Sequence, residues 1–360
     1  MARVRGVFGK ASIAFIRLQR GRYEQIYGGE LIGSTDTLDR LARTADYGSV
    51  LDQRIVEHED DLEPLRTLGF HGLDAKVKSR DTLSYEEAFS LVAFVCMATN
   101  RPLFERLKDR TGGAQHGLLD DHNLVIDHGI SLLQAMSTRE AIIGLQSQEI
   151  AGMIAATVEL DTVIRVSGEH AEGVFAIGGM GGDRGIRVNG AESKLFSVST
   201  ITAMILADYG FVHKHHSYPN TSKVSGQSAI EAFGARSDFE TQEEMESVLN
   251  QSRVLMTSCH STRTIHTMSH RIKGETINHV IGPGAFPHDC DVALTAFIGV
   301  NHNVHPQTYV EALQILHEKG IQRYANSVAF CGIDRRREDI PSKILDPVTY
   351  GTDATLFYLV

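Results

Sequence analysis

The chain has 360 residues, of which 42% are hydrophobic and 22% are charged, as is typical of a globular protein with one or two domains. Its net charge of −10 argues against a general affinity for nucleic acid. No apolar run is long enough to span a membrane, and the four cysteines form no Cys-x-x-Cys pair. We therefore expect a cytoplasmic protein with reduced thiols, and neither a zinc site nor a redox motif.

The first 70 residues differ in character from the rest of the chain. Residues 1–23 carry six basic residues and no acid, a charge pattern that resembles a transit peptide. We expect a structural role for them instead, such as a subunit contact. The acidic run 57–64 ends in Pro64, and glycines follow at 69 and 72, which predicts a boundary. We therefore assign residues 1–70 as an N-terminal extension of unknown role.

Helical patterns dominate the next hundred residues. Residues 84–100 open with Ser84 and place Glu86 and Glu87 in the first turn, ahead of apolar residues at helical spacing. Two more helices are predicted over 120–137 and 138–158, the second starting at Thr138 with Glu140 close behind. This pattern predicts an all-helical domain over residues 71–168.

The pattern changes at about residue 173 to alternating strands and helices, which predicts βαβ units and an α/β domain over residues 169–360. The central sheet should be mostly parallel and flanked by helices. Strands are predicted over 173–179, 211–216, 253–258, 291–300 and 325–332. Helices are predicted over 197–210, with Ser197 or Ser199 as the cap, and over 225–235, 241–252 and 307–320.

A glycine loop follows the first predicted strand. Gly178, Gly179, Gly181 and Gly182 surround Met180, and Asp183 comes next. The loop fits neither a Rossmann glycine pattern nor a P-loop, because no Gly-Lys-Ser/Thr closes it. Taken alone it also suits a plain tight turn. Because hydroxyls at 197–200 start a helix soon afterwards, a site for a highly phosphorylated ligand is favoured.

A second segment, residues 214–234, follows the next predicted strand. Lys214 supplies a compact cation suited to a phosphate or pyrophosphate. Hydroxyl residues are frequent after it, among them Ser217 and Ser222. A hydroxyl-rich loop with no ligand is the alternative.

Together these segments resemble the family of anthranilate phosphoribosyltransferases and pyrimidine nucleoside phosphorylases. Its Gly-Thr-Gly-Gly-Asp loop, Phe-Asn-x-Ser-Thr segment and Lys-His-Gly-Asn loop correspond to residues 179–183, 196–200 and 214–217. The resemblance continues through residues 231–234 to Asp334 and covers residues 75–335. It implies a small helical domain, with a return segment near 260–280 and a homodimer contact, and a larger domain that binds phosphoribosyl pyrophosphate.

The resemblance also implies a reaction in which a nitrogen of an aromatic acceptor attacks C1 of phosphoribosyl pyrophosphate and pyrophosphate leaves. The catalytic residues would be Asp183, Lys214 and His215. The residues expected to bind phosphoribosyl pyrophosphate are Gly179, Gly181, Gly182, Asp183, Ser197, Ser199, Thr200, Lys214 and Ser222. Mg²⁺ would be bound by Ser199, Asp334 and Glu338.

Three positions depart from the family pattern. Its Asp-Glu magnesium pair reads Asp334-Arg335 here, so the second carboxylate is missing or comes from Glu338 or Asp339. The arginine that binds the acceptor carboxylate corresponds to Glu275, which either receives an N–H of the acceptor or pairs with a surface cation. The loop asparagine is Ser217. We therefore expect an acceptor other than anthranilate, with a nucleobase-like heterocycle favoured.

The remaining acceptor-binding residues are expected to be His215, His260 and Asn303. Asn303 lies in residues 299–306, after a predicted strand, where ligands bind in open α/β sheets. His302 and His305 in the same loop either join the pocket or cap the following helix. Two other functions stay open: a pyrimidine-type nucleoside phosphorylase, and a non-catalytic relative that binds nucleic acid, against which the net charge argues.

Overall fold

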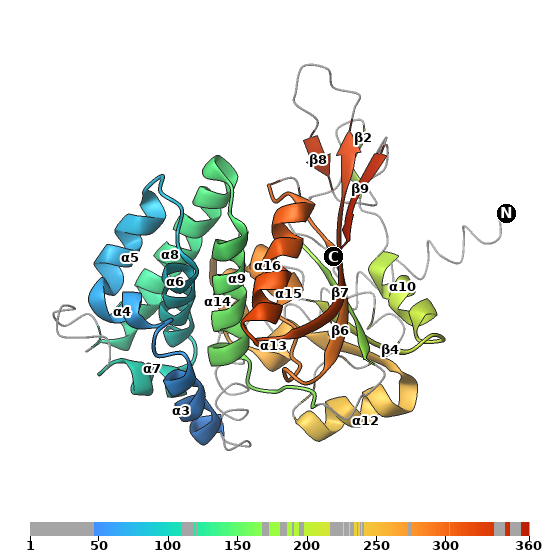
Figure 1. Cartoon of the computed structure of the whole chain (residues 1–360), viewed down its shortest axis with the longest axis horizontal. Helices are drawn as coiled ribbons and strands as arrows, with labels where there is room; N and C mark the ends of the chain where they lie inside the picture. Colours follow the sequence, from blue (N-terminus) through green and yellow to red (C-terminus); the bar gives the residue numbers. More distant parts are fainter. Residues whose placement is uncertain are drawn as a thin grey trace.

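A computed structural model describes most of the chain as two units that lie side by side (Figure 1). One unit is helical, and the other is a sheet with helices on both faces, so the predicted α/β class is correct. The structure describes residues 47–109, 119, 121–167, 173–180, 186–188, 191–193, 198–216, 226, 230, 234–235, 237, 239, 241–272, 276–301, 303–334, 343–345 and 354–359.

The helical unit is built around two central helices, α6 and α9. Ser84 and Glu87 form a reciprocal capping box at the start of α6, which satisfies backbone N–H groups that the helix leaves free. The helices of this unit are α3 (Tyr47–Glu57), α4 (Glu63–Thr67), α5 (Gly69–Lys78), α6 (Tyr85–Met97), α7 (Arg101–Leu107), α8 (His122–Ile143) and α9 (Ser147–Ala156), which continues as the π-helical turn Thr157–Asp161.

One predicted helix boundary in this unit is wrong. A single helix, α8, runs through Thr138, and the break comes at Gly144, whose φ is 83°. Thr138 is held inside the helix because its hydroxyl donates to the carbonyl of Gln134. Gly144 ends the helix because a positive φ costs glycine little, and α9 begins three residues later.

Residues 47–70, grouped with the N-terminal extension from sequence, pack with the helical unit. Tyr47, Leu51 and Leu65 are buried in the same hydrophobic core as α6 and α9. The hydroxyl of Tyr47 donates to the carbonyl of Leu160 at 2.9 Å. Residues 1–46 lie outside the described part of the chain.

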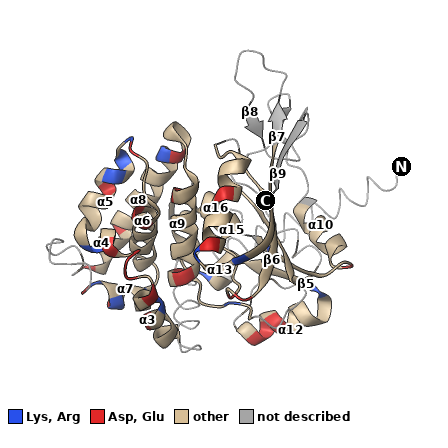
Figure 2. Cartoon of the chain, viewed as in Figure 1, with Lys and Arg blue, Asp and Glu red and all other residues tan. Residues whose placement is uncertain are grey.

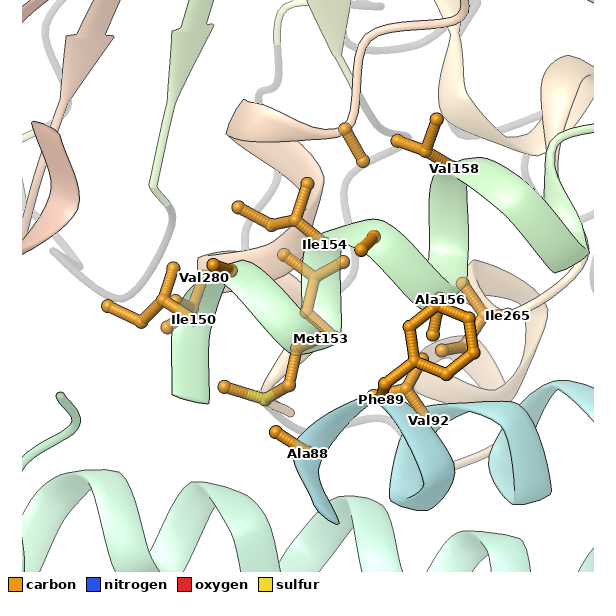
Figure 3. Close-up of a cluster of buried hydrophobic side chains, with 14 of the residues drawn as sticks. Ala88, Phe89, Val92, Ile150, Met153, Ile154, Ala156, Val158, Ile265 and Val280 are labelled. Carbon is orange, nitrogen blue, oxygen red and sulfur yellow. The ribbon is translucent and has the colours of Figure 1, made fainter. Parts of the chain in front are cut away.

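The return segment packs against the helical unit. It contains α13 (Cys259–Thr262), α14 (His266–Ile272) and α15 (Asn278–Gly284). Ile265 and Val280 from this segment meet Met153, Ile154 and neighbouring residues of α9 in one buried apolar cluster (Figure 3). Dense packing of this kind supplies the main hydrophobic stabilisation of the unit.

The sheet has the strand order β5-β4-β1-β6-β7, and these five strands are parallel. Two further strands, β8 and β9, pair antiparallel with β7. The strands of this sheet are β1 (Val174–Gly179), β4 (Phe211–His216), β5 (Val254–Ser258), β6 (Ala293–Gly299), β7 (Arg323–Asp334), β8 (Lys343–Leu345) and β9 (Ala354–Leu359). A separate antiparallel pair joins β2 (Ile186–Val188) to β3 (Ala191–Ser193).

The helices that cover the sheet lie on opposite faces. After β1 the chain enters α10 (Val198–Leu206), and α12 (Gln242–Ser252) precedes β5 on the same side. After β6 it enters α16 (Pro306–Glu318), which packs on the face toward the helical unit (Figure 1). Neighbouring strands whose following helices cover opposite faces define a topological switch point, where ligands bind in open α/β sheets. Here that point lies between the carboxyl ends of β1 and β6.

In the described part of the chain, three backbone segments run between the two units, and hydrogen bonds join them. The amide of Val163 donates to the carbonyl of Thr262, and the amide of Val166 donates to that of Pro287, at 2.8 and 2.9 Å. Isolated bridges pair Thr162 with Arg263 and Val166 with His288. The two units are therefore connected by backbone segments that hydrogen-bond to one another.

Charges of both signs are distributed over the helices (Figure 2). The clearest single-sign feature is the acidic first half of α12, where Glu243, Glu244 and Glu246 lie close together. Among the described residues, no helix is both long and apolar enough to cross a membrane.

Candidate functional site

The carboxyl ends of the central strands bring the predicted motifs to one edge of the sheet. Gly179 at the end of β1 is in register with Gly299 at the end of β6, and the amide of Met180 donates to the carbonyl of Gly299 at 2.8 Å. Lys214 on β4 is in register with Ile177 of β1. The glycine loop, the Lys214 segment and the loop after β6 therefore start side by side at the switch point.

The first two glycines of the loop have different surroundings. A Cβ on Gly178 would lie 2.4 Å from the carbonyl oxygen of Pro283, so the backbone of α15 approaches too closely for a side chain. A Cβ on Gly179 would meet nothing within 4 Å. Gly178 is thus needed for packing, whereas Gly179 presents bare backbone to open space, which suits the approach of an anion.

The helix after the loop starts near the same edge. α10 begins at Val198, so Ser199 and Thr200 lie in its first turn. Ser199 is therefore not the cap that the sequence left possible, and the other candidate, Ser197, is outside the described residues. A helix N-terminus carries a partial positive charge, and α10 comes after β1 and the β2–β3 pair in the chain.

Lys214 is a buried cation at this edge. It is 5% exposed and has no hydrogen-bonding or ionic partner among the residues that the structure describes. Burial lowers its pKa from the usual 10.5 to about 8. A buried ammonium without a counter-ion is costly, and this one would be stabilised by an anion.

His215, the second predicted catalytic residue, is held inside the protein by both ring nitrogens. Its Nδ1 lies 2.8 Å from the hydroxyl of Thr257, and Nη2 of Arg263 lies 2.7 Å from its Nε2. His213 on the same face of β4 contacts the same Thr257 hydroxyl at 2.6 Å and His288 at 2.6 Å. In this structure the ring of His215 is therefore part of an internal network.

Sequence reasoning missed Arg263, which comes directly after α13. Its side chain is fully buried, and it donates to the carbonyl of Ala285 as well as to His215. Its Nε and Nη1 have no partner in the described part of the chain. Burial lowers its pKa to about 10. The sequence carried no local signal for it, because Arg263 lies in a stretch rich in serine, threonine and histidine, residues 257–270.

Asn303, predicted to bind the acceptor, lies in the loop after β6. Its side-chain amide donates to Oε1 of Glu140 on α8 at 3.4 Å, and its backbone amide donates to Asn301. It therefore connects the edge of the sheet to the helical unit. His305 caps α16 by accepting from the amide of Gln307, and His260 lies in α13 beside His266. Sequence reasoning did not identify Glu140 as part of this region.

The other predicted site residues are not described by the structure. They are Gly181, Gly182, Asp183, Ser197, Ser217, Ser222, Glu275, His302, Glu338 and Arg335, with Asp339 beside them. Asp334 is the last residue of β7, which continues four residues beyond Phe330, the final pair with β6. At ~3.3 Å per residue the backbone of Asp334 stands about 13 Å past that pair.

Magnesium would need oxygen ligands from this group. A serine hydroxyl and carboxylates are the ligand types that Mg²⁺ prefers, so Ser199, Asp334 and Glu338 fit the ion chemically. Among the described residues there is no group of three or more His, Cys, Asp or Glu side chains that could hold a metal. A magnesium ion bound to the diphosphate of a ligand needs fewer protein ligands than a dedicated metal site.

A helical unit beside a five-stranded parallel α/β unit, with a switch point at glycine-rich strand ends, defines a two-unit α/β fold suited to phosphorylated ligands. At the level of sequence, neither a family model nor a curated protein matches the chain. Solved structures do match it in fold, among them anthranilate phosphoribosyltransferases.

The enzyme from Thermus thermophilus matches with a TM-score of 0.50 at 19% identity, over 80% of this chain and 72% of its own. The enzyme from Saccharomyces cerevisiae, in complex with phosphoribosyl pyrophosphate and Mg, matches with a TM-score of 0.51 at 15% identity, over 75% and 67%. The chain therefore has an anthranilate phosphoribosyltransferase-like fold, and the low identity fits a divergent member of that fold group.

Proposed function

We propose that the protein is a phosphoribosyltransferase that transfers the 5-phosphoribosyl group from phosphoribosyl pyrophosphate to a nitrogen of an aromatic acceptor. The observation that carries this proposal is the buried Lys214, which lacks a partner among the described residues, on the strand next to β1, whose end at Gly179 presents open backbone. A diphosphate is the kind of ligand that such a cation and such a backbone stabilise. The fold shared with anthranilate phosphoribosyltransferases supports it.

In this proposal the protein works by positioning and electrostatics. The bond between C1 of the ribosyl group and the diphosphate oxygen breaks as the acceptor nitrogen bonds to C1, and the leaving pyrophosphate gains charge. Lys214, the loop amides from Gly179 to Asp183 and the start of α10 would stabilise that charge. Mg²⁺ bound by Ser199, Asp334 and Glu338 would neutralise part of it. Asp183 would face the ribosyl centre as it becomes cationic.

We also propose that the acceptor is a nitrogen heterocycle that carries no carboxylate. The sequence resemblance aligns Glu275 with an arginine of the anthranilate enzymes, and a carboxylate repels an acceptor carboxylate. Glu275→Arg should weaken use of the true acceptor and admit an aryl carboxylate, measured as kcat/KM over a panel of bases and aryl acids. Unchanged kinetics in this variant would place Glu275 outside the acceptor pocket.

A direct test of the donor uses calorimetry with Mg²⁺ and phosphoribosyl pyrophosphate. The unmodified chain should bind, and Gly182→Arg should abolish binding by filling the loop. Lys214→Met should weaken binding at least about tenfold, because a charge-assisted contact contributes roughly 1.5–3 kcal/mol. Lys78→Met on α5, which removes an exposed lysine, is the matched control and should bind normally.

Absence of binding at millimolar ligand would contradict the transferase. Phosphorolysis of a nucleoside with inorganic phosphate alone would favour the second candidate, a pyrimidine-type nucleoside phosphorylase. That candidate stays open because its substrate phosphate would meet the same Lys214 and glycine loop. The two are separated by measuring which anion, pyrophosphate or phosphate, competes with phosphoribosyl pyrophosphate.

A further inference from the structure

Five buried side chains form a continuous hydrogen-bonded relay behind the candidate site. The relay consists of Arg263, His215, Thr257, His213 and His288, which are between 0% and 5% exposed. Its four contacts measure 2.7, 2.8, 2.6 and 2.6 Å in that order. It joins strands β4 and β5 to two of the three segments that connect the units.

Arg263 determines which atoms donate and which accept in the hydrogen bonds of the relay. A guanidinium only donates, so Nε2 of His215 must accept and its proton must sit on Nδ1. That Nδ1–H donates to the hydroxyl of Thr257. The Thr257 hydroxyl has one further partner among the described residues, Nε2 of His213, so its own proton reaches an acceptor only if it donates there.

The same reasoning continues to the end of the relay. If Nε2 of His213 accepts, the His213 proton is on Nδ1 and donates to Nε2 of His288. In this arrangement His213, like His215, carries a proton on Nδ1. A protonated His215 is disfavoured because it would set an N–H against the N–H of Arg263. Arg263 therefore fixes the tautomer of His215, and the Thr257 hydroxyl links that tautomer to His213.

We propose that Arg263 is a positioning residue that acts through His215. By fixing the relay, it holds the carboxyl end of β4, where Lys214 stands next to His215, against the segments that connect the units. His215 is thereby a structural member of the relay and not an acid, base or acceptor ligand. The proposal rests on the proposed function only for the effect on ligand binding, because the tautomers are independent of any ligand.

The cost of the arrangement supports a role of this kind. Arg263 is fully buried, two of its nitrogens lack partners in the described part of the chain, and the described residues place no carboxylate within salt-bridge distance. An apolar side chain of similar volume would avoid that desolvation cost. Unlike an apolar residue, the arginine supplies N–H groups that donate hydrogen bonds and cannot accept them.

The test is imidazole nitrogen NMR on the full chain labelled with ¹⁵N-histidine, with His213→Gln and His215→Gln used to assign the signals. Both histidines should show the proton on Nδ1. In Arg263→Met, His215 should lose that pattern. In Thr257→Val, His215 should keep it, because Arg263 still donates to its Nε2, and the link to His213 is removed. Thr257→Ser, which restores the hydroxyl, should match the unmodified chain.

A proton on Nε2 of His215 in the unmodified chain would overturn the proposal, as would an unchanged His215 pattern in Arg263→Met. If Arg263→Met does not fold, the unmodified chain and Thr257→Val still decide it. Arg263→Met should also weaken binding of Mg²⁺-phosphoribosyl pyrophosphate about tenfold, the loss of one hydrogen bond to a charged group. If the unmodified chain binds none, the proposed function fails and the spectra still decide the role of Arg263.

A buried-arginine control separates positioning from stability. Arg139 is 4% exposed and pairs with Glu149 inside the helical unit, away from the relay. Arg139→Met should lower the melting temperature and leave the His213 and His215 signals unchanged. Altered tautomers in Arg139→Met would mean that general destabilisation, not the guanidinium of Arg263, changes the relay.

Discussion

Glu140, which is buried, pairs with the partly buried His279: Nε2 of the ring lies 2.9 Å from the carboxylate, while Nδ1 lies 2.5 Å from the carbonyl oxygen of Thr276. Both neighbours accept hydrogen bonds and neither donates. We predict that the ring carries a proton on each nitrogen and forms an ion pair with Glu140, whose side chain is 1% exposed. The pair ties α8 to α15, and Asn303 joins it from the edge of the sheet.

Breaking this pair from either side should be costly and non-additive. Glu140→Gln or His279→Asn each leaves one charged partner buried, so each should lower the free energy of unfolding by about 3 kcal/mol. The double variant should cost less than the sum of the two. Urea denaturation of all four proteins gives the coupling energy, and strict additivity would contradict an ion pair.

Neighbouring glycines of the loop should respond differently to the same substitution. Gly178→Ala places a methyl group against the backbone of Pro283 and should lower the melting temperature by several degrees. Gly179→Ala meets open space and should fold as well as the unmodified chain, yet bind phosphoribosyl pyrophosphate more weakly. Differential scanning fluorimetry measures the melting temperature of each variant, and calorimetry measures its binding of phosphoribosyl pyrophosphate. Each variant is the control for the other.

Because of Lys214, a rise in pH should stabilise the folded chain and weaken its binding of phosphoribosyl pyrophosphate. Its pKa of about 8 in the folded chain lies below the ordinary 10.5, so the unfolded chain binds more protons between these values and stability should rise with pH there. Below pH 8 the full penalty applies, and Lys214→Met should be more stable by up to about 3 kcal/mol.

The measurement is the difference in unfolding free energy between the two proteins at pH 7, 8, 9 and 10. It should shrink as pH rises, while the affinity of the unmodified chain for phosphoribosyl pyrophosphate falls. A difference that does not vary with pH would mean that Lys214 is not a buried cation.

Asp161 should make the folded chain less stable as the pH rises through the acid range. It is fully buried, and it accepts from the amides of Thr264 and Ile265, which attaches the return segment to the helical unit. Burial raises its pKa from 3.8 to about 6, so the folded chain binds the extra proton and this contribution is lost as pH rises from about 4 through 6.

Relative to Asp161→Asn, the unmodified chain should therefore lose up to about 3 kcal/mol of unfolding free energy between pH 4 and pH 7. Urea denaturation at unit pH steps measures it. A difference that does not change between pH 4 and pH 7 would contradict a buried carboxyl group with a raised pKa.

Much of the fold was predictable because it depends on local pattern. Period and caps marked α6, α12 and α16, and alternation with glycine-rich turns marked β1, β4 and the order of the βα units. The helix break at Gly144 was misplaced because Thr138 and Glu140 form a plausible start, although packing and an intrahelical bond keep them inside α8. Residues 47–70 were separated from the helical unit because Pro64 and the glycines at 69 and 72 indicated a boundary, although Tyr47, Leu51 and Leu65 are buried in the shared core.

The sequence by itself determined the α/β class, the glycine loop and the lysine near the end of β4, because strand ends, glycines and cations are local features of a chain. The tertiary structure decided the rest. It separated Gly178, pressed against Pro283, from Gly179, which faces open space. It brought Arg263 into contact with His215, 48 positions away in the sequence, and Glu140 into contact with Asn303, 163 positions away. Such contacts follow from how sheet and helices pack, and no local pattern encodes them.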